Sequence, residues 1–143
     1  MSSNPMPKER KVKRVSRVFT VLILIACAFL LFTGNVSVDF NEESMDIRVS
    51  YWADGNVRYD GIRSVTYRDD ISTGSRTGGL GTPRLQAGHF KNSEFGKYLL
   101  YAYSDCKYYV VLETDNTYVV VNGKNEAATK LLYEEIIKRL DVE

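Results

Sequence analysis

Histidine and cysteine, two residue types that often carry catalysis, are scarce in this sequence of 143 residues. The one histidine is His89, and the two cysteines are Cys27 and Cys106. Because Cys27 lies in an apolar segment and Cys106 lies far outside it, we expect no disulfide between them, and packing must hold the fold together. Nothing around Cys106 matches the local signature of a cysteine enzyme. The sequence therefore predicts no catalytic residues and a protein that is not an enzyme.

The sequence also lacks the patterns that bind metals and phosphate groups. Asp69 and Asp70 are adjacent, but a calcium loop needs a closing bidentate acidic residue, which residues 69–80 do not have. The glycine-rich residues 78–82 are followed neither by the Lys-Ser/Thr pair of a phosphate loop nor by a predicted helix. We therefore expect no metal site and no cofactor.

Charge is absent from a long apolar segment near the N-terminus. Residues 19–32 are FTVLILIACAFLLF, and residues 18–34 together reach the lower length limit for crossing a bilayer. Residues 1–17 contain six Lys and Arg residues against Glu9 alone, a net charge of +5, so the rest of the chain carries −4. Basic residues beside a membrane helix stay on the cytoplasmic side. We therefore predict a single-pass cell-membrane protein with a basic cytoplasmic tail (1–17), a transmembrane signal anchor (18–34) and an extracytoplasmic C-terminal domain.

Two other interpretations of the apolar segment remain open. A cleaved secretory signal would also combine a basic region with an apolar run, although this run continues past residues 26–28 without a clear cleavage site. Residues 24–27 (LIAC) resemble a lipobox, in which Cys27 would carry a lipid, although apolar residues follow it. In each case the remaining chain is mildly acidic, which argues against nucleic acid as a partner.

Alternating apolar and polar residues predict a series of antiparallel strands after a polar juncture at residues 35–43, where Val36 and Val38 can begin an edge strand. Asp-Gly at 54–55 and Asp-Asn at 115–116 favour tight hairpin turns. We expect the last three strands to form a meander, in which each strand pairs with the next. The predicted strands cover residues 45–51, 57–59, 62–67, 85–90, 95–103, 108–114 and 117–122.

The longest interruption between predicted strands is residues 69–84. It contains four glycines and Pro83 with Ser and Thr between them, so we expect a mobile loop rather than regular structure throughout. Four arginines lie in or near this segment, and the arginine fork suits phosphate and carboxylate groups. We predict that any ligand-binding residues are Arg63, Arg68, Arg76 and Arg84.

The apolar pattern changes after Gly123 to the spacing of a helix. Asn125 can cap the first turn, Glu126 suits the helix N-terminus, and Lys138 and Arg139 suit the last turn. We predict a helix over residues 125–140 that packs on the sheet. Its apolar face is expected to contain Ala128, Leu131, Leu132, Ile136 and Leu140.

The order and spacing of several short segments make residues 40–140 similar to the bacterial pleckstrin-homology-like (PH-like) domain family. These segments are YDGIRSV (59–65), the spaced glycines of 74–81, GHF (88–90), GKY (96–98) and TKLLY (129–133). The resemblance implies a mainly β fold with one C-terminal α-helix: an antiparallel, partly open barrel over residues 44–143, closed at one end by the helix.

The resemblance supplies a fold more than a function, so two functional hypotheses follow. The first is a non-catalytic interaction module that binds a protein or peptide partner at the membrane surface, through a sheet edge for example. The second is binding of an anionic lipid head group or envelope polymer by the arginines around the glycine-rich segment.

Overall fold

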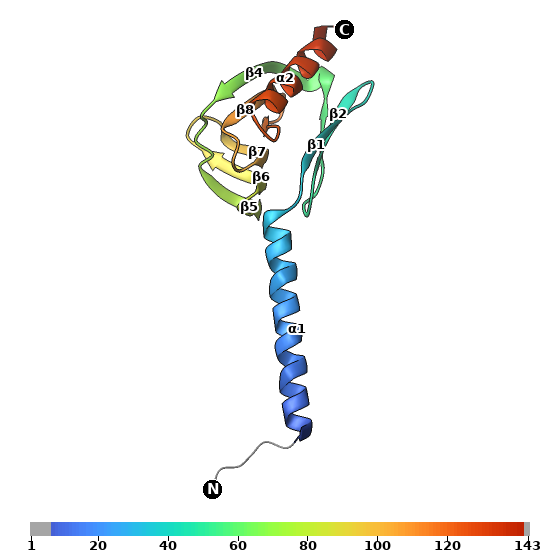
Figure 1. Cartoon of the computed structure of the whole chain (residues 1–143). Coiled ribbons are helices and arrows are strands. Elements are labelled where there is room, and N and C mark those ends of the chain that lie inside the picture. The colour runs from blue at the N-terminus through green and yellow to red at the C-terminus, as the bar shows by residue number, and fades with distance from the viewer. Residues whose placement is uncertain (1–6, 142–143) are drawn as a thin grey trace. The chain divides into compact units, whose positions relative to one another are not determined.

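The computed structural model describes residues 7–141 and separates into two compact units, Met1–Thr33 and Gly34–Glu143. The first unit contains the helix α1 (Pro7–Phe32), and the second contains nine strands and the helix α2 (Glu126–Asp141) among the described residues (Figure 1). The fold is therefore mainly β with one C-terminal helix, preceded by a long apolar helix, as the sequence predicted.

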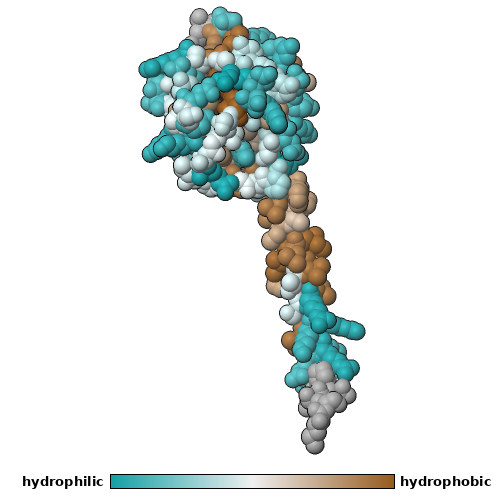
Figure 2. Space-filling view, turned by 90° about the vertical axis from the view of Figure 1, so that its left-hand side faces the viewer, coloured by the Kyte–Doolittle hydropathy of each residue, from teal (hydrophilic) through white to brown (hydrophobic). Residues whose placement is uncertain are grey.

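The helix α1 is long and apolar enough to cross a membrane. Its 26 residues span about 39 Å, and the mean hydropathy of its most apolar window is 2.5. None of its side chains is buried within the protein. Figure 2 shows its middle as a continuous apolar band beside a hydrophilic, charged end. The Thr20 and Thr33 hydroxyls donate to carbonyl oxygens one turn earlier, so they add no unsatisfied polar groups. Such a helix could anchor the protein in a membrane.

The second unit is built from two sheets that share no ladder of hydrogen bonds with each other. The smaller sheet has the order β1-β2-β3, and the larger has the order β4-β8-β9-β7-β6-β5. Because the sheets do not close on each other, the barrel is partly open, as predicted. The strands are β1 (Val36–Phe40), β2 (Ser44–Val49), β3 (Gly55–Arg58), β4 (Ile62–Asp69), β5 (Ser75–Gly81), β6 (Leu85–Asn92), β7 (Gly96–Tyr103), β8 (Tyr108–Thr114) and β9 (Tyr118–Val121), with a 3₁₀ turn (Tyr59–Gly61) before β4.

The predicted meander of the last three strands is wrong. The strand β9 lies between β7 and β8, pairing parallel with β7 and antiparallel with β8. The side chain of Asn122, at the end of β9, accepts from Tyr103 N–H at 2.7 Å and donates to the carbonyls of Tyr103 and Cys106 at 3.3 and 3.1 Å. These bonds hold the β7–β8 connection across the end of β9, and local sequence does not indicate such long-range pairing.

The prediction that residues 69–84 form a mobile loop is wrong for residues 75–81, which form the edge strand β5. The backbone of Gly79, at φ +142°, lies so close to β6 that a Cβ there would be 2.1 Å from the Ala87 carbonyl oxygen. A bulge between Arg76 and Gly78 shifts the register of the strand. The glycines therefore permit a close approach of two strands instead of interrupting the sheet.

The main core lies between the two sheets and α2, which packs on β4 and β8 (Figure 1). The predicted N-cap is confirmed, because Asn125 Oδ1 accepts from Ala128 N–H at 2.9 Å. The predicted apolar face is correct for Ile136, which is fully buried, and in part for Leu132, which is half-buried. It is wrong for Leu131, whose side chain is 66% exposed. The packed side of the helix is therefore shifted from the predicted face, because it includes Thr129 and Tyr133 and leaves out Leu131.

Candidate functional site

The four arginines predicted to bind a ligand contact different parts of the domain. Arg63, near the start of β4, bonds to Asp115 at 2.8 Å, and Arg68, near its end, forms an ion pair with Glu94. These two arginines are five positions apart along an extended strand, which corresponds to roughly 17 Å. Their guanidinium groups are therefore held apart by separate carboxylates.

The other two arginines lie beside β5 and β6. Arg84 Nε donates to the Gly34 carbonyl oxygen at 2.7 Å, and its guanidinium lies 5.4 Å from the centre of the Tyr103 ring. Arg76, on the edge strand β5, lies next to Gly81 and has no ion pair or hydrogen bond within residues 7–141. Of the four, Arg76 is thus the one whose guanidinium has no polar partner among the described residues.

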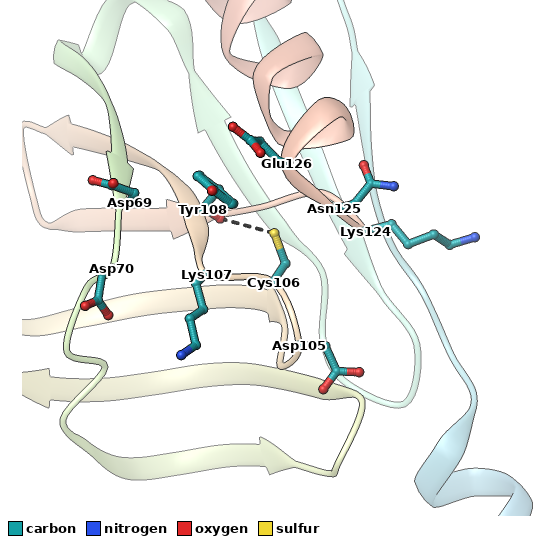
Figure 3. Close-up of a pocket in the computed structure, with 9 residues that line it drawn as sticks. All are labelled: Asp69, Asp70, Asp105, Cys106, Lys107, Tyr108, Lys124, Asn125 and Glu126. Carbon is teal, nitrogen blue, oxygen red and sulfur yellow. Dashed lines mark hydrogen bonds between the residues drawn. The ribbon is translucent and has the colours of Figure 1, made fainter.

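An open pocket of about 500 Å³ lies where the end of β4, the β7–β8 connection and the start of α2 meet (Figure 3). Figure 3 shows Asp69 and Asp70 on one side of this pocket and Lys124 and Asn125 on the other, with Cys106 between them. Charges of both signs line the pocket, and no histidine does. The lining residues are Asp69, Asp70, Asp105, Cys106, Lys107, Tyr108, Lys124, Asn125 and Glu126.

The contacts of this pocket indicate structure rather than catalysis. The Cys106 thiol is 4% exposed and lies within hydrogen-bonding distance of the Tyr108 carbonyl oxygen and the Thr129 hydroxyl. The nearby carboxylate of Glu126 is the largest cause of the raised pKa of Tyr108, followed by burial. Among the described residues, no group of three or more His, Cys, Asp and Glu side chains is placed to hold a metal ion. The pocket therefore offers charged groups without a paired nucleophile and base.

A second pocket, of about 450 Å³, lies where the two sheets separate, and we call it the seam pocket. Its apolar wall is formed by Val57 of β3, Leu99 of β7 and Val119 of β9. No residue of β1 or β2 lines it, so it lies on the side of β3 that faces away from β2. The full lining is Asn56, Val57, Arg58, Asp60, Gly61, Leu99, Thr114, Asp115, Asn116, Thr117 and Val119.

The acidic groups on the rim of the seam pocket already have partners. Asp60 pairs with Arg58 at 3.1 Å, which is the main cause of its lowered pKa, and Asp115 pairs with Arg63. Sequence reasoning missed this pocket because its residues come from separate segments between positions 56 and 119. The one local signal was the Asp-Asn turn at 115–116, which forms part of the rim.

Two open sheets with a C-terminal helix packed on one of them define a PH-like domain, the class that the sequence predicted. Residues 36–135 match the family described as Bacterial PH domain, which covers most of the folded unit. The chain belongs to this family. No curated protein and no solved structure matches it at a significant level. A PH-like domain is typically a non-catalytic binding module.

Proposed function

We propose that the protein is a membrane-anchored, non-catalytic interaction module whose PH-like domain binds a protein or peptide partner outside the cytoplasm. The seam pocket carries this proposal. It combines an apolar wall with the unpaired side of a strand, and an exposed strand edge is a common place for another chain to bind. The helix α1 is apolar and fully exposed, which supports the proposal that it anchors the protein in a membrane.

The orientation rests on the basic flank of α1, with residues 18–34 as the segment that contacts the bilayer. An open sheet edge near residues 47–51 would favour such a partner. The structure places Ile47 in β2, the central strand of its sheet, so the edges available there are β1 and β3.

Binding of an anionic lipid head group or envelope polymer is the second candidate, and Arg76 is the observation that favours it. Its guanidinium has no ion pair or hydrogen bond among residues 7–141 and lies against Gly81 of the edge strand β5. This candidate has less support, because Arg63 and Arg68 are neutralised by Asp115 and Glu94.

A photocrosslinking amino acid at position 116, on the rim of the seam pocket, tests the proposal in cells that produce the full-length chain. The matched control carries the same group at position 130, on the exposed side of α2. We expect a protein adduct from position 116 and none from position 130. Equal adducts at both positions, or adducts of lipid mass only, would contradict the proposal.

A further inference from the structure

We propose that the seam pocket receives an extended acidic segment of a partner, which adds to the free edge of β3 as a fourth strand. This inference rests on the proposed function and specifies the form and charge of the ligand. Three independent features support it: the direction of the β3 main-chain groups, the wall of the pocket, and a pair of lysines beside it.

The main-chain groups of β3 leave two residues available for a new strand. Tyr59 N–H donates to the Glu43 carbonyl oxygen at 3.1 Å, continuing the pairing of β3 with β2 beyond the end of the strand. In an antiparallel ladder, hydrogen-bonded positions alternate with positions whose N–H and C=O point to the other side. Asn56 and Arg58 therefore direct their main-chain groups toward the seam pocket.

An added strand would lie beside Leu99, because the other two residues of the apolar wall, Val57 and Val119, are already buried. The strand β3 begins over Tyr101, since a Cβ on Gly55 would lie 2.8 Å from the Tyr101 hydroxyl. Beyond β3, Leu99 is half-buried, and its neighbour on β6 is the exposed His89. Every second side chain of an added strand would point toward the face of the larger sheet that carries Leu99.

Unpaired positive charge lies on the same face of β6 and β7, next to the seam pocket. Lys91 and Lys97 are directly opposite each other, and Lys97 shares its face with Leu99, two residues away. Like charges in this arrangement destabilise a sheet. Every ion pair among residues 7–141 uses an arginine, so neither lysine is neutralised there. Carboxylates on the bound segment would supply the missing partners.

The first test uses a labelled seven-residue peptide of alternating Glu and Val, titrated into the full chain in neutral detergent micelles. Asn56→Pro removes an outward-pointing N–H without removing a bond to β2, so the fold should survive. Asn56→Ala is the matched control, because it loses the side-chain bonds of Asn56 to Ser44 and Asp46 but keeps the N–H. We expect fluorescence anisotropy to show binding about tenfold weaker for Asn56→Pro and unchanged for Asn56→Ala.

The second test addresses charge with two double variants. Lys91→Gln with Lys97→Gln should weaken binding of the Glu-Val peptide about threefold to tenfold and reduce its salt dependence. Lys130→Gln with Lys138→Gln removes equal charge from the exposed side of α2 and should leave binding unchanged. A Lys-Val peptide of the same length should not bind, and a Glu-Val peptide with methylated main-chain nitrogens should bind poorly even if Asn56→Pro fails to fold.

Equal affinity for the Glu-Val and Lys-Val peptides, or no effect of main-chain methylation, would overturn this inference. Displacement of the bound peptide by phosphatidylglycerol vesicles would mean that Lys91 and Lys97 bind a membrane surface. That result would also overturn the inference. If position 116 still gives a specific protein adduct in cells, the interaction module stands while the added strand fails. Loss of the adduct at position 116 and failure of the peptide to bind would together contradict both the interaction module and the added strand.

Discussion

At the scale of single residues, the polar side chains that the fold buries are structural. Asn122 is 1% exposed, and its side-chain amide bonds to the main chain of both Tyr103 and Cys106. Tyr98 is 2% exposed, and its hydroxyl donates to the Thr73 carbonyl oxygen at 2.6 Å. That bond ties the β4–β5 connection to β7, so both residues determine topology more than they serve a ligand.

Tyr98 also makes the free energy of unfolding depend on pH in the alkaline range. Burial, and to a smaller extent the nearby Tyr109, raises the pKa of Tyr98 to about 12 from an ordinary value near 10. The fold favours the neutral phenol, so this contribution is complete below pH 10 and is lost as the pH rises toward 12. We expect the free energy of unfolding to fall by about 2 kcal/mol over that range on account of Tyr98.

Urea unfolding of the full chain in micelles, followed from pH 9 to pH 12, measures this effect. Tyr98→Phe should be about 1 kcal/mol less stable at neutral pH, because it lacks the hydroxyl bond, but its stability should fall less steeply above pH 10. Parallel curves for the parent and the variant would show that Tyr98 ionises as freely in the folded state as in the unfolded state.

At the scale of elements, α2 shows which part of a predicted helical face the sheet uses. Ile136→Ala should lower the free energy of unfolding by about 2–5 kcal/mol, because Ile136 is fully buried in the core. Leu131→Ala is the matched control from the same helix and should change stability by less than about 0.5 kcal/mol, since Leu131 is exposed. The loss in the free energy of unfolding for Leu132→Ala should lie between these two values.

Thermal and urea unfolding of the three variants distinguishes these cases. A large loss for Leu131→Ala would mean that α2 packs through the face that the sequence suggested. Equal, small losses for all three would mean that α2 contributes little to the core. Equal, small losses would also weaken the photocrosslinking control at position 130, because that control assumes that α2 is packed firmly on the sheet.

At the scale of the whole molecule, the side of the membrane on which the domain lies is a prediction from charge. Six basic residues precede the apolar segment, so we expect the C-terminus outside the cytoplasm. Green fluorescent protein fused after Glu143 should stay dark on export through the general secretory route, while alkaline phosphatase at the same position should be active. A bright fluorescent fusion with inactive phosphatase would reverse the orientation.

A variant with the basic residues of positions 8–17 replaced by glutamine is the control for this orientation. If the basic flank sets the topology, this variant should show a mixture of both reporter signals. An unchanged signal would mean that another feature, such as export of the folded domain, sets the orientation.

Features that depend on neighbouring residues could be predicted from the sequence. The apolar run, the alternation along the strands and the cap at Asn125 predicted α1, most of the strands and α2, because strand and helix periods are local properties. The order of these segments was enough to indicate the PH-like family. Local pattern also predicted Ile136 as a core residue, since a buried position must fit the helical period.

Features that depend on pairing between distant segments could not be predicted in this way, because they arise only when the chain folds. The fold inserts β9 between β7 and β8. It also makes the glycine-rich residues 75–81 a strand, because Gly79 and Gly88 pair across the adjacent strands β5 and β6. It paired Arg63 and Arg68 with carboxylates that composition alone could not assign to them. The seam pocket arises in the same way, because a surface between two sheets exists only after both have formed and packed.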